Sequence, residues 1–147
     1  MLKVAALSGI ALGLCVGCVA APVLNMTYHS DPEGATLYEG GRLWGSTPVT
    51  LTYQDGRAAF ARNECLRLNP MHVRWASGVV ASVSDLQACP ATGFFQAYVF
   101  VRPPDIPGAD IDANFAIQLQ RNSALQQQAN AQDATAVAES LRSQKAH

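Results

Sequence analysis

The sequence predicts an all-β fold, a small antiparallel β-sandwich, followed by an α-helical tail. Two observations carry this prediction. Between residues 24 and 104, short runs of β-branched and aromatic residues alternate with turns rich in glycine, proline, aspartate and asparagine. From residue 110 onward the chain contains no glycine or proline and is rich in alanine and glutamine, a composition that favours helix. We therefore expect one β domain at 24–104, then a loop and a helical or partly disordered tail at 105–147.

The first segment, residues 1–17, has the pattern of an export signal peptide. One positive charge, Lys3, precedes an uncharged stretch at 4–14, which has the length of a signal peptide's apolar core. A helix that crosses the bilayer needs about 20 apolar residues, and this apolar run is broken at Pro22. A signal peptide is therefore a better interpretation than a permanent transmembrane helix.

The signal ends in two cysteines spaced C-x-x-C, Cys15 and Cys18. A redox pair needs a supporting βαβ context and a zinc site needs two further ligands, and the sequence around the pair predicts neither. Val16-Gly17-Cys18 instead resembles the end of a bacterial lipobox, although a lipobox usually has leucine where Cys15 stands. The alternative is ordinary signal cleavage near Ala21.

The lipobox resemblance implies a lipoprotein attached to the membrane through Cys18. Acyl chains such as palmitate would hold it there through a linker at 18–23, and each buried methylene contributes about 0.8 kcal/mol. Val19 is not an acidic retention signal. By resemblance to Gram-negative lipoproteins, this implies an outer-membrane protein that faces the periplasm. Cleavage near Ala21 would instead give an unanchored periplasmic protein.

The charge of the chain is nearly balanced, with 10 Lys and Arg residues, 11 Asp and Glu residues and a formal net charge of −1. Proteins that bind nucleic acid usually carry a basic patch or stripe. The arginines of this chain are scattered singly along the sequence. We therefore expect no nucleic-acid partner.

Two further cysteines, Cys65 and Cys89, lie in the predicted β domain. In an oxidising envelope compartment an isolated pair most often forms a disulfide. Closing a loop of about 25 residues would stabilise the fold by about 3 kcal/mol. The alternative is a thiol nucleophile, which needs a histidine and a charged partner nearby. His72 is the only histidine in this segment, so the sequence favours the disulfide.

The first part of the β domain is predicted to contain four short strands, at 23–29, 36–38, 42–44 and 49–53. The residues between them are those that chain reversals need. Gly40-Gly41 predicts a two-residue hairpin turn, because glycine enters positive φ without steric cost. Asp55-Gly56 is expected to close the fourth strand with another turn.

Residues 30–51, SDPEGATLYEGGRLWGSTPVTL, resemble the PEGA domain, a small β domain of bacterial and archaeal envelope proteins. The positions that match its pattern are Ser30, Pro32, Gly34, Ala35, Leu37, Tyr38, Gly41, Gly45, Thr47, Pro48 and Leu51. One departure is Gly40, where aspartate or asparagine is common. The resemblance implies a hairpin core with turns at these positions, in a domain that contacts other proteins of an envelope assembly.

The second half of the β domain departs from the PEGA pattern and is expected to extend the hairpin core. The predicted elements are a strand at 65–68, a hairpin of 71–76 and 79–83 around Ser77-Gly78, and a last strand at 94–101. The last strand is the most β-like run of the chain.

The tail is expected to form a helix capped by Asp110 or Asp112. Its apolar residues cluster on one face, which is expected to pack on the sheet. That face contains Ile111, Phe115, Leu119 and Asn122. The remainder is expected to be a solvated spacer. The alternative is a helix that pairs with a partner or reaches toward peptidoglycan.

No combination of residues predicts catalysis or metal binding. Asp110, Asp112 and Asn114 match the first three ligands of a calcium loop, but Phe115 replaces its glycine and Arg121 its final glutamate. No phosphate-binding loop, nucleophile elbow or zinc-binding helix motif occurs. We therefore expect a non-enzymatic protein with no cofactor and no metal.

The aromatic residues offer a candidate binding surface at Trp44 and Tyr38. Core and cross-strand packing is the interpretation that the small size of the domain favours, and Trp44, at a hairpin edge, is the best candidate for an exposed ring. Together these observations predict a non-enzymatic envelope lipoprotein whose β domain contacts an unidentified envelope protein. The alternative class is a glycan- or peptidoglycan-binding module that uses the exposed aromatic rings.

Overall fold

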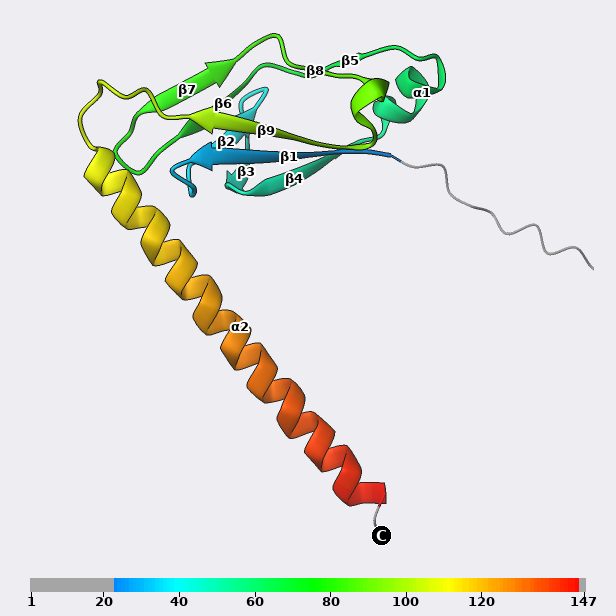
Figure 1. Cartoon of the computed structure of the whole chain (residues 1–147), viewed down its shortest axis with the longest axis vertical. Coiled ribbons are helices and arrows are strands. Elements are labelled where there is room, and N and C mark those ends of the chain that lie inside the picture. Colours follow the sequence, from blue (N-terminus) through cyan, green and yellow to red (C-terminus); the bar gives the residue numbers. More distant parts are fainter. Residues whose placement is uncertain (1–22, 146–147) are drawn as a thin grey trace, which may run out of the picture.

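The computed structural model of the chain describes residues 23–145. The predicted signal peptide, Cys18 and all of the predicted linker except Val23 lie outside the described residues. The described part consists of a β-rich domain and one long C-terminal helix, α2 (Ala109–Lys145), which leaves the domain at an angle (Figure 1). The prediction of a β domain followed by a helical tail is therefore confirmed.

One sheet has three strands in the order β4-β1-β9. The central strand β1 (Leu24–Asp31) pairs antiparallel with β4 (Val49–Tyr53) and parallel with β9 (Phe95–Val101). The parallel pair corrects the prediction of an entirely antiparallel domain. It arises because the chain enters β9 at the same end at which it enters β1. There, the backbone N–H of Asn25 donates to the carbonyl of Phe94 at 2.7 Å.

The second sheet has four antiparallel strands in the order β3-β2-β6-β7. Their bounds are β2 (Thr36–Glu39), β3 (Arg42–Ser46), β6 (Met71–Arg74) and β7 (Val80–Val83). Both predicted hairpins are present. The β2–β3 turn has positive φ at both of its glycines, +55° at Gly40 and +81° at Gly41, as a two-residue hairpin turn requires.

The segment between β4 and β6 differs from the prediction. A helix, α1 (Asp55–Ala61), begins where a turn was expected, and its Gly56 lies close to β1. A Cβ atom on Gly56 would lie 2.5 Å from the Cβ of Leu24. The strand predicted at 65–68 shortens to β5 (Leu66–Arg67), which pairs with β8 (Gln87–Ala88). A short 3-10 helix, η1 (Pro90–Thr92), then leads into β9.

The two larger sheets contribute side chains to one hydrophobic core. Along β1, Leu24, Met26 and Tyr28 are buried and alternate with half-buried residues, as expected for a strand with one face inward. Leu37 and Val73 of the second sheet are fully buried in the same cluster. The core therefore lies between the sheets and is closed at one end by α1.

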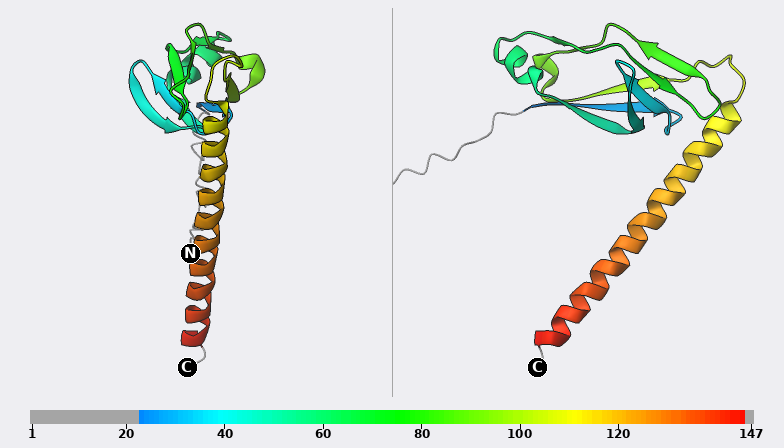
Figure 2. Two further views of the ribbon diagram at one scale, coloured as in Figure 1. Left: turned by 90° about the vertical axis from the view of Figure 1, so that its left-hand side faces the viewer. Right: turned by 180° about the vertical axis from the view of Figure 1, so that it is seen from behind.

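Helix α2 has 37 residues, which corresponds to a length of about 55 Å. Figure 2 shows that only its first turns lie near the β domain. Its buried residues are Asp112 and Ala116, with Leu119 half-buried. The predicted face of Ile111, Phe115, Leu119 and Asn122 is therefore rotated by about one residue from the observed one, and Ile111 is 52% exposed.

The capping prediction for α2 is wrong. The helix begins at Ala109, so Asp110 and Asp112 both lie within its first turn. The Asp112 carboxylate instead points into the β domain, where side chains distant in sequence bind it. No helix within residues 23–145 combines the length and the apolar character that a bilayer span requires.

Candidate interaction surface

The PEGA-like turn residues meet in one hydrogen-bonded cluster. The Ser30 hydroxyl donates to the carbonyl of Pro32 at 2.7 Å and lies against the Thr47 hydroxyl. Since the single Ser30 proton is engaged, Thr47 is the donor of that second bond. The backbone N–H of Gly34 donates to Thr47 at 3.0 Å, and that of Ala35 donates to Ser30 at 3.2 Å. The Ser30 hydroxyl is therefore saturated, the Thr47 hydroxyl has both a donor and an acceptor partner, and both play a structural role.

The same turn supports helix α2. Gly34 has φ +100°, and a Cβ atom there would lie 2.5 Å from Leu119 Cδ1 and 3.3 Å from the Phe115 ring. The Pro32 carbonyl also accepts a hydrogen bond of 2.9 Å from the Trp75 indole. The turn thus joins the two sheets and leaves room for the helix to pack on Gly34.

A buried ion pair fixes the start of α2. Arg102 Nε donates to Asp112 Oδ2 at 2.6 Å, and the two side chains are only 5% and 0% exposed. The backbone N–H and the hydroxyl of Ser77 donate to the two Asp112 oxygens at 2.7 Å each. The Arg102 guanidinium also donates to the carbonyls of Pro103 and Pro107. Both charges are therefore satisfied, as burial requires.

The pKa of Asp112 reflects these bonds. Burial by itself would raise the pKa of this carboxyl. The hydrogen bonds from Ser77 and the nearby Arg102 guanidinium outweigh burial and hold the pKa below its ordinary value. Asp112 is therefore ionised at neutral pH and keeps the helix attached to the loop before it and to the β6–β7 turn.

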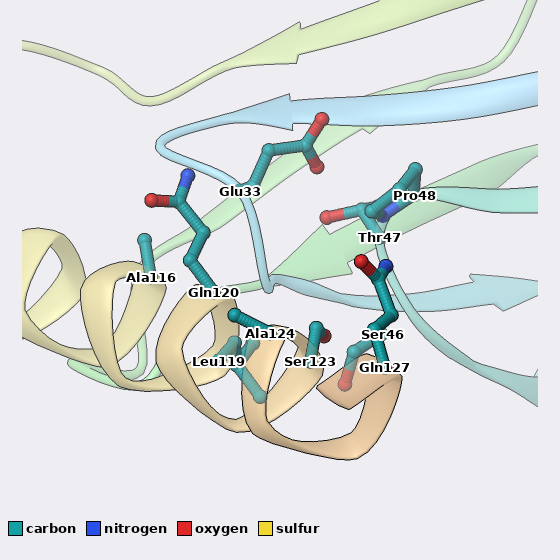
Figure 3. A pocket seen from close by; sticks show the side chains of 10 residues that line it. All are labelled: Glu33, Ser46, Thr47, Pro48, Ala116, Leu119, Gln120, Ser123, Ala124 and Gln127. Carbon is teal, nitrogen blue, oxygen red and sulfur yellow. The ribbon is translucent and has the colours of Figure 1, made fainter. Parts of the chain in front are cut away.

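A groove of about 670 Å³ opens between α2 and the β domain (Figure 3). Its lining residues are Glu33, Ser46, Thr47, Pro48, Ala116, Leu119, Gln120, Ser123, Ala124 and Gln127. The Glu33 carboxylate accepts from His29 Nδ1 at 2.7 Å and from the Ser30 backbone N–H at 3.3 Å. The groove thus offers amides, hydroxyls and small side chains, which suit hydrogen bonding rather than nucleophilic chemistry.

A chain of buried hydroxyls links the two sheets at another point. Tyr28 and Tyr53 share a hydrogen bond of 2.8 Å, and Tyr53 donates to Glu39 at 2.9 Å. Because Glu39 accepts the Tyr53 proton, Tyr28 is the donor to Tyr53. Burial raises the pKa of Tyr28 to about 12 and raises that of Tyr53 as well. Both phenols are therefore neutral at physiological pH and serve packing.

The two aromatic residues of the candidate binding surface are each covered on part of their surface. Trp44 is half-buried against the core, and the Arg42 guanidinium lies 4.1 Å from its ring centroid. Its indole Nε1 is buried and has no hydrogen-bond partner among residues 23–145. Tyr38 stacks on His72 with ring centroids 4.8 Å apart. The Tyr38 contact is cross-strand packing and the Trp44 contact lies within β3, and both leave less of each ring for a ligand.

Strand β9 carries an exposed apolar row that the sequence analysis did not identify. We call Phe95, Ala97, Val99 and Val101 the β9 row. All four are exposed, with Phe95 at 81%, Val99 at 50% and Val101 at 66%. The signal was present in the alternation of FQAYVFV, in which every second residue is apolar. Only the sheet order shows that this face is outward and that β9 forms an edge.

Exposed apolar side chains continue beyond β9 toward the start of α2. Ile106 is 44% exposed and Ile111 is 52% exposed. On the neighbouring strand β1, the residues in register with the β9 row are polar: Asn25, Thr27, His29 and Asp31. The β9 row is therefore an apolar strip along one edge of a polar sheet face. Exposed strips of this kind mark contact sites.

The sulfur atoms of Cys65 and Cys89 lie 2.05 Å apart, at disulfide-bond distance. The pair joins the residue before β5 to the residue after β8 and so closes the small third sheet. A bonded Cys65 has no free thiol to act as a nucleophile. This geometry agrees with the disulfide that the sequence favoured.

No candidate metal centre is found in the described part of the chain. Within residues 23–145, no group of three or more histidine, cysteine, aspartate or glutamate side chains is placed to hold a metal ion. The calcium-loop resemblance at Asp110, Asp112 and Asn114 has a structural explanation, because Asp112 is engaged by Arg102 and Ser77.

Comparison with known proteins identifies no similar protein. No family model, no curated protein and no solved structure matches the chain. The resemblance to the PEGA domain therefore depends on residues 30–51 alone. Function has to be argued from the surfaces described above.

Proposed function

We propose that the protein is a non-enzymatic envelope lipoprotein whose PEGA-like β-sandwich mediates protein–protein contacts in an envelope assembly. In this proposal Cys18 is lipid-modified and the β domain faces the periplasm from the outer membrane. The pairing of Cys65 with Cys89 supports an oxidising compartment, since disulfides persist there.

One observation carries the contact function: apolar side chains are exposed in a strip from β9 to the start of α2. Val99, Val101, Ile106 and Ile111 are each 44–66% exposed. The central part of a protein interface is depleted of charged residues, and β9 contains none. This end of the β domain therefore offers a partner protein an apolar surface from which water can be excluded.

Photo-crosslinking in living cells tests this function. A photoreactive side chain is placed at Val101 in the full-length chain, and a matched one at Leu43, which is 58% exposed on β3 of the other sheet. We expect a discrete protein adduct from Val101 and much less from Leu43. Equal adducts from both positions, or none from Val101, would contradict the proposal.

A glycan- or peptidoglycan-binding module is the second candidate. The groove beside α2 favours it, because Gln120, Ser123 and Gln127 supply amides and a hydroxyl that can bond sugar hydroxyls. The test is co-sedimentation of the full-length protein with purified peptidoglycan. Retention that Gln120→Ala or Gln127→Ala weakens would favour this function, and loss on Trp44→Ala alone would point to the aromatic surface.

A further inference from the structure

We propose that Phe95 contacts the lipid bilayer and sets the orientation of the β domain on the membrane. This inference deepens the proposed function and rests on its lipid anchor at Cys18. The partner is the surface of a phospholipid membrane, into whose boundary between headgroups and acyl chains the Phe95 ring inserts.

The position of Phe95 follows from the parallel pairing of β1 and β9. Phe95 is in register with Asn25, the second residue of β1, and the Asn25 N–H binds the carbonyl of Phe94. The most exposed large apolar side chain of the described residues, at 81%, thus lies beside the point where the chain enters the fold. That point is the part of the domain closest along the chain to Cys18.

The length of the intervening chain limits how far this end can move from the membrane. Five residues, 19–23, separate Cys18 from Leu24. Even fully extended, the six backbone steps from Cys18 to Leu24 span at most about 22 Å. The acyl chains of Cys18 begin at the interface, so the end of the domain that holds Leu24 and Phe95 stays close to it.

The strands around Phe95 can approach lipid at a small cost in desolvation free energy. Strand β9 and the adjoining half of β1 contain no charged residue. The Asn25 side chain already donates to the carbonyl of Val23 and accepts from Thr52. Contact of this edge of the sheet with the bilayer therefore strands no charge of these two strands, while it removes an aromatic ring from water. The charged side chains at this end, Asp55, Arg57, Arg62 and Glu64, belong to α1 and the turn after it.

The other end of the β9 row lies away from the membrane in this arrangement. Val101 is six residues further along the strand, about 20 Å from Phe95. Phe95 then serves the membrane and Val101 remains available to a partner protein. The two ends of the β9 row therefore have different surroundings, so Val101 serves as the control for Phe95.

Photo-crosslinking to lipid tests the inference. The full-length chain carries a photoreactive side chain at Phe95, at Val101 or at Leu43, and it is illuminated in intact membranes. We expect phospholipid adducts from position 95 and a strong loss of them at positions 101 and 43. Absence of an excess at position 95, or a protein adduct there in place of lipid, would overturn the inference.

Fluorescence gives a second readout that does not depend on cross-linking chemistry. Phe95→Trp and Val101→Trp variants of the lipidated full-length protein are placed in vesicles of phosphatidylethanolamine and phosphatidylglycerol with brominated acyl chains. Trp44 and Trp75 contribute equally to both variants. Bromine is expected to quench Phe95→Trp more than Val101→Trp, and equal quenching would contradict membrane contact by Phe95.

The mass of the mature N-terminus separates failure of this inference from failure of the proposed function. A lipidated Cys18 without lipid contact at Phe95 would overturn the inference alone. An N-terminus that begins beyond Cys18 would overturn the lipid anchor, and the inference with it. Lipidation together with lipid adducts at Phe95 supports both.

Discussion

Gly34 illustrates how a single residue joins the β domain to its helix. Its φ of +100° is strained for any other residue, and a Cβ atom there would force the Leu119 side chain to shift. Gly34→Ala is expected to lower the free energy of unfolding by about 2–4 kcal/mol, because left-handed backbone and overpacking both become costly. Urea denaturation of the full-length protein measures this loss.

Gly78→Ala is the matched control for that prediction. Gly78 has φ +89°, but a Cβ atom there would meet nothing within 4 Å. Only the cost of the left-handed backbone remains, about 1–2 kcal/mol. Equal losses for the two variants would show that Leu119 does not pack on Gly34.

Asp112 makes the attachment of α2 sensitive to acid. Its pKa in the folded protein is lower than the ordinary value of 3.8, so its contribution to stability is complete above that value. The contribution is lost as the pH falls from 3.8 through the lower folded pKa. We expect the unfolding free energy of the wild type to decrease over this range because of Asp112, and acid titration of stability measures it.

Asp112→Asn provides the comparison. At neutral pH the variant leaves the buried Arg102 without a counter-ion and is expected to lose about 3–5 kcal/mol. Its stability should then change less than that of the wild type as the pH falls below 3.8. A constant difference between the two proteins across this range would contradict the assignment of the acid sensitivity to Asp112.

Tyr28 is expected to ionise later than an ordinary tyrosine. Burial raises its pKa to about 12 from 10.0, so the neutral form stabilises the fold below pH 10. This contribution is lost as the pH rises from 10 through 12. Absorbance titration of tyrosinate should show that Tyr28 and Tyr53 both ionise late, and Tyr28→Phe should remove the part that belongs to Tyr28; a titration unchanged by that substitution would refute the prediction.

At the scale of elements, α2 divides into a base that packs on the β domain and a longer exposed part. Asp112 and Ala116 are buried, whereas every residue from Gln120 to Arg142 is exposed. Deletion of 128–147 is therefore expected to change the unfolding free energy of the β domain by less than about 0.5 kcal/mol. Circular dichroism should show a loss of helix signal with an unchanged urea midpoint. A shifted midpoint would mean that the distal helix contacts the domain.

Local sequence signals were sufficient to predict the elements that depend on neighbouring residues alone. Gly40-Gly41 and Ser77-Gly78 mark the two hairpin turns, and the absence of glycine and proline beyond residue 110 marks α2. The parallel pairing of β9 with β1 has no such signal, since it joins residues about 70 positions apart along the chain. Helix α1 was missed because Asp55-Gly56 also has the composition of a turn.

The surfaces of the molecule were harder to predict than its elements. Trp44 and Tyr38 were the aromatic residues considered as a possible binding surface, yet Phe95 is far more exposed than either. Exposure depends on which strand forms an edge and on which of its faces is outward, and the sequence does not specify the sheet order. The buried pairing of Arg102 with Asp112 was missed for the same reason, because it requires the loop between β9 and α2 to fold back on Ser77.

At the scale of the whole molecule, the entry point of the chain and the exposed apolar side chains near α2 lie at opposite ends of the β domain. The chain enters at Leu24 beside Phe95, continues through a β domain closed by Cys65 and Cys89, and exposes apolar side chains where α2 begins. In the proposed arrangement the first end is held at a membrane and the second end meets a partner protein. The lipid anchor at Cys18 is the point on which this arrangement depends.

The intact mass of the mature N-terminus tests that dependence most directly. Protein is extracted from bacterial membranes and its first peptide is measured by mass spectrometry. The account predicts a peptide that begins at Cys18 and carries the added mass of a diacylglyceryl group and a further acyl chain. An unmodified peptide that begins near Ala21 or Pro22 would contradict it.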